Sequence, residues 1–156
     1  MLVRKKYPFI KDLLEDSGFL MLQVSSLWAD YRDRVLKKYY LISHMQFSIL
    51  ASVYWFNLHN EKQITQTMLA RCTRISPMTI SQILKVLVSK GYIYRTTHLT
   101  DARAKSVGLT DSGKDLMDKA VETIYDVDTK FFSILSKNVK HFNHYMVELL
   151  NANDVI

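Results

Sequence analysis

Apolar residues recur at helical spacing through the first quarter of the chain. Between about residues 10 and 38 they fall at intervals of three and four, on one face of a helix. The members of this stripe are Leu20, Val24, Leu27, Tyr31 and Val35, with Trp28 beside it. The spacing predicts a long amphipathic helix. Ser17-Gly18 could separate its first turns, because glycine costs about 1 kcal/mol relative to alanine inside a helix.

A second helix is predicted directly after the first. Ser43-His44-Met45-Gln46 matches a capping box, in which the serine hydroxyl and the glutamine side chain satisfy the first free amides of a helix. The run FSILASVYWF that follows is apolar nearly all round. We therefore expect a helix from Ser43 to about Asn57 that is buried on several sides.

Two short helices joined by a tight turn are predicted next. Thr65 is a suitable N-cap for a helix from Gln66 to Arg74, and residues 63–64 before it could add a short strand. Ser76 is a second N-cap residue, and Pro77 stands at the first helical position, where a missing amide hydrogen leaves no bond unmade. This succession is typical of a helix-turn-helix.

The second of these short helices has a face suited to DNA. Its apolar stripe is Ile80, Ile83, Leu84 and Leu87. The other face is small, polar and basic and has no carboxylate; its residues are Met78, Thr79, Ser81, Gln82, Lys85 and Ser89. Hydroxyls allow close approach, an amide can pair with an adenine edge, and lysine can contact phosphate or guanine. We interpret this helix, with Ser76 at its cap, as one that reads the major groove; an ordinary solvated helix is the alternative.

A hairpin is expected to follow. Gly91 would end the reading helix in the left-handed conformation, and residues 92–97 and 105–109 are β-prone. Asp101 is expected to brace the linking loop while Arg103 reaches into the minor groove, and Arg95 and Lys105 add positive charge on the strands. The alternative for Asp101 and Arg103 is an exposed ion pair of little energetic consequence.

Two further helices are predicted after the hairpin. Thr110 would cap a helix to about Phe132, with an acidic face of Asp111, Asp115, Asp118, Glu122 and Asp126. Lys114 and Lys119 lie within this stripe, so a solvated face is favoured over a metal or partner site. Ser136 would start a last helix, with Val139, Phe142, Met146, Leu149 and Leu150 on its apolar side.

These elements predict one mainly α domain over residues 1–156 with a small β-hairpin wing. Residues 43–110 would form a winged helix-turn-helix lobe, and 1–42 and 111–156 would be dimerisation helices. The terminal helices carry more apolar residues than one lobe can cover. A two-fold dimer would also place two reading helices about one DNA turn apart.

The positive charge is concentrated in the middle of the chain. The net charge of +6 equals that of residues 61–110 alone, which hold eight basic and two acidic side chains, while residues 1–60 and 111–156 carry +3 and −3. Neutralising backbone phosphates releases counterions and dominates nucleic-acid affinity, so double-stranded DNA is the expected partner.

Five short motifs resemble, in order and spacing, the winged-helix core of the multiple-antibiotic-resistance regulator (MarR) family of bacterial repressors. They are LAR at 69–71, ISPMTIS at 75–81, LVSKGYIYR at 87–95, DAR at 101–103 and VGLTDSG at 107–113. The resemblance implies a homodimer with two DNA-binding lobes. It places Ser81 and Gln82 at the bases, Arg103 in the minor groove and Asp101 at the wing brace.

The family resemblance also implies a pocket for a small-molecule effector. Its candidate lining for a small aromatic or anionic ligand is Trp28, Tyr31, Arg32, Tyr54 and Trp55, although core packing explains these residues equally well. His141, His144 and Glu148 have a spacing that could bind a divalent metal, but a surface or dimer-contact role is favoured. Cys72, the lone cysteine, is expected to be a small buried residue without the redox role of the family's peroxide sensors.

The pattern excludes other classes of protein. No phosphate-binding glycine loop, nucleophile elbow or His-Glu-x-x-His motif occurs, so neither an enzyme nor a cofactor is expected. No apolar run reaches the length of a membrane span and no signal-peptide core develops, so the expected location is the cytoplasm. The prediction is a homodimeric transcriptional regulator, in the simplest case a ligand-released repressor on a pseudo-palindromic operator. The alternatives are a winged-helix protein-interaction module and a metal-responsive regulator using His141 and His144.

Overall fold

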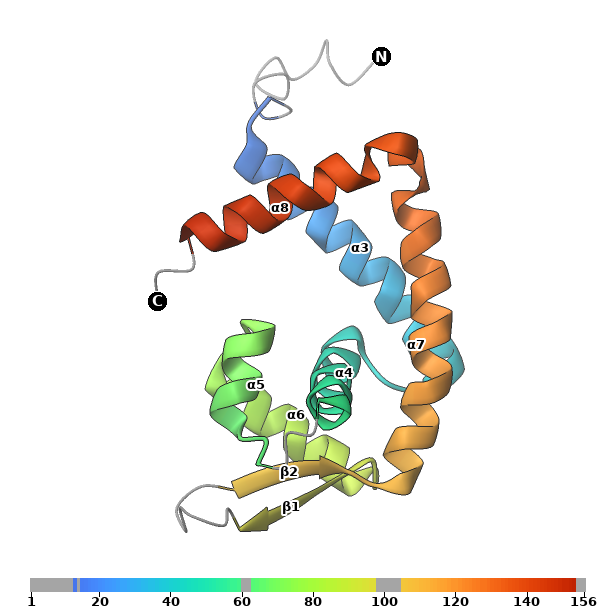
Figure 1. The fold of residues 1–156 in the computed structure, drawn as a ribbon. Helices are drawn as coiled ribbons and strands as arrows, with labels where there is room; N and C mark the ends of the chain where they lie inside the picture. The colour runs from blue at the N-terminus through green and yellow to red at the C-terminus, as the bar shows by residue number, and fades with distance from the viewer. Residues whose placement is uncertain (1–12, 14, 60–62, 98–104, 154–156) are drawn as a thin grey trace. The chain divides into compact units, whose positions relative to one another are not determined.

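The computed structural model describes residues 13, 15–59, 63–97 and 105–153. Two compact units divide the chain, Met1–Glu122 and Thr123–Ile156. The first holds α3 (Ser17–Tyr40), α4 (His44–Leu58), α5 (Gln66–Thr73), α6 (Pro77–Ser89), β1 (Ile93–Thr97), β2 (Lys105–Leu109) and the first half of α7 (Asp111–Phe132) (Figure 1). The second unit holds the rest of α7, the 3-10 helix η1 (Ser133–Asn138) and α8 (Val139–Asn153). The fold is therefore mainly helical with one small hairpin, as predicted.

Local capping chemistry sets where the helices begin. The Ser43 hydroxyl accepts from the Gln46 amide at 3.1 Å while the Gln46 side chain accepts from the Ser43 amide at 3.0 Å, which confirms the capping box of α4. Thr65 caps α5 and Ser76 caps α6, also as predicted. The long first helix starts at Ser17, because the Asp16 carboxylate caps it. Ser17-Gly18 thus opens α3, and residues 15 and 16 before it are not helical.

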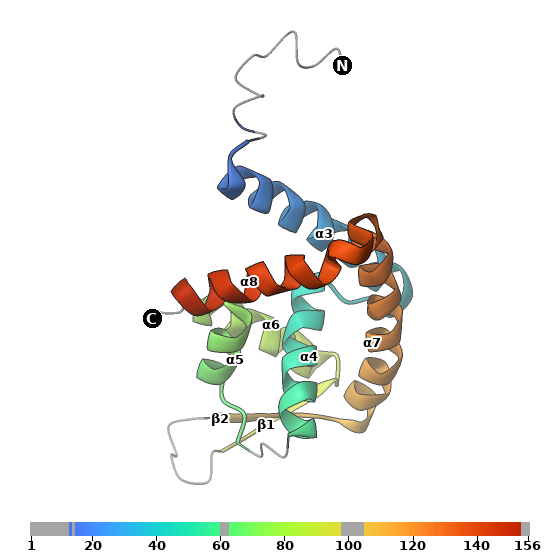
Figure 2. The ribbon, with the colours of Figure 1, turned by 45° about the horizontal axis from the view of Figure 1, so that its top comes forward.

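Helix α4 is the centre of the first unit. Figures 1 and 2 show it between α5 and the first half of α7. Its buried residues are Phe47, Ile49, Leu50, Ser52 and Val53, which point in several directions around the helix and confirm the prediction of burial on several sides. Leu69 of α5 and Ile80, Leu84 and Leu87 of α6 are also buried, so the predicted apolar stripe of the reading helix faces the core.

Only the second half of α3 contributes to this core. Leu36 is fully buried and Arg32 nearly so, whereas Leu20, Val24 and Leu27 are exposed. The stripe predicted for this helix is therefore not a core stripe along its whole length. Apolar periodicity reports that a face avoids water, but it does not say whether the protomer itself covers that face.

The hairpin pairs β1 with β2 in an antiparallel register, from Ile93 opposite Leu109 to Thr97 opposite Lys105. Tyr94 lies across Gly108, since a Cβ on that glycine would come within 2.3 Å of the tyrosine ring. The short strand predicted at residues 63–64 is replaced by a single bridge between Thr65 and Ser106, with the Val107 amide donating to the Ile64 carbonyl at 2.8 Å. The chain leaves the sheet there because Thr65 must already cap α5.

The second unit differs from the prediction at its turn. Ser136 has φ 47° and ψ −125° inside η1, so it cannot open a helix, and α8 begins at Val139 instead. Within the described part of α8 no residue is buried, and Leu149 and Leu150 are at least half exposed. No helix in the described ranges is long and apolar enough to cross a membrane.

Candidate nucleic-acid interface

Helix α6 presents the predicted reading face to solvent. Met78, Gln82 and Lys85 are exposed, and Ser81 is half-buried between them and the core stripe. Met78, in the first turn, has 74% of its surface accessible. Within α6 the face has no carboxylate, so nothing on this helix would repel a phosphate.

The cap of α6 uses two of the predicted contact residues locally. The Ser76 hydroxyl accepts from the Thr79 amide at 3.2 Å, and the Ser76 and Thr79 hydroxyls lie 2.8 Å apart in a hydrogen bond. These hydroxyls are therefore already hydrogen-bonded within the first turn of the helix. Met78, Ser81, Gln82 and Lys85 remain the side chains whose ends are directed outward.

Gln66 is a positioning residue that the sequence analysis did not identify. Its side-chain amide donates to the Pro77 carbonyl at 2.8 Å and so joins the first turn of α5 to the first turn of α6. The bond fixes the angle of the two helices at the end where α6 would enter a groove. A glutamine directly after an N-cap residue carries no distinctive sequence signal, because its partner is a backbone atom 11 positions away.

The other end of α6 is held just as firmly. Lys90 donates from Nζ to the Leu41 carbonyl at 2.5 Å, and Gly91 adopts φ +73°, which confirms the predicted left-handed end. The Thr110 hydroxyl donates to the Gly91 carbonyl at 2.6 Å and accepts from the Gly113 amide at 3.0 Å, so the predicted cap of α7 also binds this turn. Lys90, one of the eight basic residues between positions 61 and 110, therefore stabilises the fold.

The wing supplies two further basic residues in different environments. Lys105 is exposed at the start of β2. Arg95 lies on the same side of β1 as buried Ile93, is half-buried, and has a buried Nε without a hydrogen-bond partner among the described residues. Period-two alternation places its side chain on the same side as Ile93, and its direct DNA contact stays a prediction. Asp101 and Arg103 lie outside the described residues.

Three of the five residues proposed to line an effector pocket fall into two groups, Arg32 with Trp28 and Tyr54 by itself. Arg32 lies against Trp28, with its guanidinium carbon 4.5 Å from that ring centroid and 5.1 Å from the ring of Phe47. Tyr54 follows Phe47 by seven residues, about 10 Å along α4, and donates to Asp118 at 2.7 Å. That carboxylate, together with burial, raises the pKa of Tyr54 above its usual value.

The remaining two candidates for the pocket do not join these groups. Trp55 is 52% exposed and stacks on His59 with centroids 4.1 Å apart. Tyr31 lies below the Arg34 guanidinium at 6.0 Å. These contacts bring Arg32 and Trp28 together and place the other three side chains against different partners, and the pocket lined by all five stays a prediction.

The candidate metal ligands and the cysteine also have ordinary surroundings. His144 lies 3.3 Å from Glu148, and His141 is exposed on the same helix. Over the described ranges, no group of three or more histidine, cysteine, aspartate or glutamate side chains could hold a metal ion. Cys72 is exposed, not buried as expected; it lies at the edge of α5 with Sγ 3.7 Å from the Ser52 hydroxyl.

Comparison with known proteins agrees with this architecture. Residues 38–128 match the family model described as ArnR1-like, winged-helix domain. A relative in Bacillus subtilis (strain 168), the uncharacterized HTH-type transcriptional regulator YdcH, is 29% identical over 133 residues, covering 85% of this chain and 88% of the relative.

Two solved structures have the same fold. The DNA complex of MepR from S. aureus has a TM-score of 0.77 at 22% identity, over 88% of this chain and 98% of the other. Apo MarR from E. coli has a TM-score of 0.71 at 20% identity, over 86% and 97%. The chain belongs to the ArnR1-like winged-helix family, and its fold is the MarR-type fold that the sequence predicted.

Proposed function

We propose that the protein is a homodimeric regulator that binds a pseudo-palindromic operator and acts in the simplest case as a repressor, by occupying DNA that polymerase needs. The observation that carries this proposal is the outward face of α6, which has no carboxylate and is fixed at both ends by Gln66 and Lys90. A reading helix has to be held rigidly, because base edges are discriminated by hydrogen bonds of narrow geometry.

Each contact residue has a distinct proposed role. Gln82 would pair with a base edge in the major groove, with Ser81 and Met78 in close contact beside it. Lys85 and Lys105 would neutralise phosphates. In the wing, Arg103 would enter the minor groove, and Asp101 would brace the loop that carries it.

Dimerisation is proposed to use residues 1–42 and 111–156, with residues 43–110 as the DNA-binding lobe. Exposed apolar side chains on both terminal helices support this assignment. On α3 they are Leu20, Met21, Leu22, Val24 and Leu27, and on α8 they are Tyr145, Val147, Leu149 and Leu150. A helix that leaves this many large apolar side chains exposed in one protomer is a candidate for an interface, and a two-fold dimer would set the spacing of the two reading helices.

Release by a small molecule is the regulatory part of the proposal. A ligand can act only through different affinities for two arrangements of the lobes. We expect an aromatic or anionic effector if one of the two clusters around Arg32 and Tyr54 opens in the dimer. A metal-responsive variant using His141 and His144 would require further ligands from a partner.

Fluorescence anisotropy on duplex DNA tests the proposed function. The parent should bind with an affinity that falls steeply with salt, and Gln82→Ala should reduce the preference for operator over random DNA by about 1–3 kcal/mol. Asn57→Ala is the matched control, since it removes an exposed amide side chain from α4, outside the reading helix. Absence of any salt-dependent affinity would refute the proposal and favour a winged helix that docks a protein partner.

A further inference from the structure

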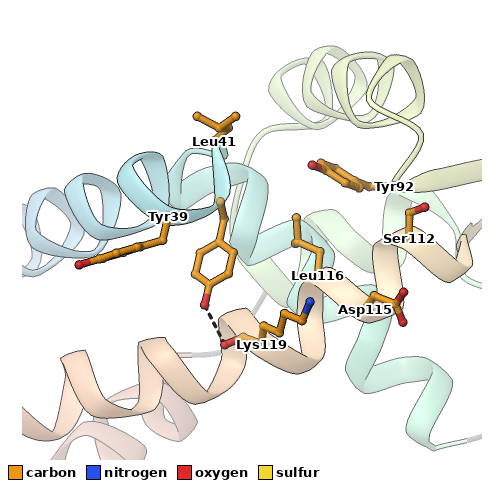
Figure 3. A pocket seen from close by; sticks show the side chains of 8 residues that line it. Tyr39, Leu41, Tyr92, Ser112, Asp115, Leu116 and Lys119 are labelled. Atoms are coloured by element: carbon orange, nitrogen blue, oxygen red, sulfur yellow. Dashed lines mark hydrogen bonds between the residues drawn. The ribbon is translucent and has the colours of Figure 1, made fainter.

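A surface hollow of about 500 Å³ lies beside the end of α3 and the first half of α7 (Figure 3). Leu116 of α7 forms its floor, with Tyr39 and Leu41 at one side and Tyr92 at the other. Asp115 and Lys119, one helical turn apart, supply its charges. None of the five residues predicted to line an effector pocket contributes to this hollow.

The apolar walls of the hollow are unusually open to solvent. Leu41 is 77% exposed and is held at φ 55°, a left-handed conformation that is uncommon for residues other than glycine. Tyr39 is 61% exposed. The wall between them is fixed, because the Tyr40 hydroxyl donates to the Lys119 carbonyl at 3.0 Å. A ligand that covered Leu41 and the tyrosine rings would remove this apolar surface from water.

The charges favour a cation at the Tyr92 end. Asp115 is exposed and has no ion pair or hydrogen bond within the part of the chain that the structure describes. Figure 3 shows Asp115 on the side of the hollow near Tyr92, and Lys119 nearer the α3 side. Residues 111–122 also carry four acidic and two basic side chains. A positive group beside a carboxylate and the face of a tyrosine is attracted by both.

We propose that this hollow binds an organic cation with an aromatic or aliphatic body, its ammonium group between Asp115 and Tyr92 and its body across Leu116 toward Leu41. A positive group at the other end of the hollow would be repelled by Lys119. The ligand would therefore bind in one orientation. The ligand class is therefore a monovalent amphiphilic amine or quaternary ammonium compound.

A ligand in the hollow would contact Leu41 and Tyr92, two residues whose backbone groups bond to the C-terminal end of α6 and the residue after it. The carbonyl of Leu41 accepts the hydrogen bond from Lys90, and the Tyr92 amide donates to the Leu87 carbonyl at 3.0 Å. A ligand that shifts Leu41 or Tyr92 therefore shifts the C-terminal turn of α6. This consequence rests on the proposed function, and it makes DNA affinity dependent on the cation.

Binding of benzyltrimethylammonium, followed by isothermal titration calorimetry on the full chain, tests the site. We expect Asp115→Asn to weaken the affinity about fivefold and Tyr92→Leu to weaken it several-fold, the range of an ion pair or a cation–π contact near the surface. Glu122→Gln is the matched control, because it removes the same charge from the same helix outside the hollow, and it should bind like the parent. Circular dichroism establishes that each variant is folded.

Two results would overturn the proposal. The first is equal affinity of the Asp115→Asn and Glu122→Gln variants for benzyltrimethylammonium. The second is tighter binding of phenylacetate, lost in Lys119→Met, which would make the hollow an anion site. The effect of the bound cation on DNA binding is tested separately. The DNA affinity of the parent should change with benzyltrimethylammonium but not with tetramethylammonium chloride at equal ionic strength. If the cation binds through Asp115 while no DNA is bound at all, the proposed function fails and the site stands.

Discussion

Replacing Gly113 by alanine tests how α7 is docked against the turn that follows the reading helix. A Cβ at this position would lie 2.0 Å from the Tyr92 carbonyl oxygen and 3.0 Å from its carbon. Because non-bonded carbon atoms normally stay about 3.5 Å away, the turn or the helix would have to move by more than 1 Å. The obstacle is backbone, so no side chain can swing aside to make room.

The same movement would strain the bonds that hold the turn. The Thr110 amide donates to the Tyr92 carbonyl at 3.1 Å, and the Thr110 hydroxyl donates to Gly91. Overpacking costs about 1–3 kcal/mol and each lost hydrogen bond about 1 kcal/mol, whereas alanine recovers at most about 1 kcal/mol of helix propensity. Gly113→Ala should therefore lower the free energy of unfolding by about 1–3 kcal/mol.

Urea denaturation at a fixed protein concentration, followed by tryptophan fluorescence, measures this loss. Gly18→Ala is the matched control, because its Cβ would meet only the Asp16 side chain, at 3.3 Å. The control should be unchanged or more stable by up to about 1 kcal/mol. A Gly113→Ala protein as stable as the parent would show that the turn and α7 are not packed as described.

Two further substitutions probe a cation and a carboxylate. Lys90→Met should lower the free energy of unfolding by about 0.5–1.5 kcal/mol and leave the salt dependence of DNA binding unchanged. Lys85→Met should instead flatten that salt dependence by about one unit at little cost in stability. Urea denaturation and anisotropy at several salt concentrations distinguish the two variants. Although burial acts to raise it, the pKa of Asp33 is held below its usual 3.8 by hydrogen bonds from the Lys37 ammonium and the His44 backbone amide, and by the positive charges of the Lys37 and His44 side chains. A depressed carboxylate pKa stabilises the fold above the unfolded value and loses that contribution as the pH falls through the folded one. Asp33→Asn should therefore be less stable than the parent at pH 7 and approach it as the pH falls through the lowered pKa. Thermal denaturation across pH checks this, and a difference that persists at pH 2 would contradict it.

Local chemistry explains which parts of the fold could be read from the sequence. Ser43, Thr65, Ser76 and Thr110 cap the helices predicted for them, because each N-cap bond joins atoms at most three residues apart. The left-handed Gly91 follows from the same kind of signal. The outward face of α6 follows from its apolar period alone.

Features that depend on distant partners could not be read in this way. Arg32 looked like a ligand-binding cation, but its surroundings are set by Trp28 and by Phe47 on another helix. The role of Gln66 could not be predicted from the sequence, because its partner is the backbone carbonyl of Pro77, which any residue type would supply. The left-handed Ser136 was missed because a serine is usually expected to open a helix, and nothing nearby in sequence marks the turn.

Selection of bound sequences from random duplex DNA tests the central claim most directly. Two α6 helices related by a two-fold axis should enrich an inverted repeat whose half-sites are centred about one helical turn apart, and Gln82→Ala should lose base preference at one position in each half-site. Enrichment of no sequence, or of one asymmetric site that Gln82→Ala selects equally well, would contradict a dimeric reader built on α6.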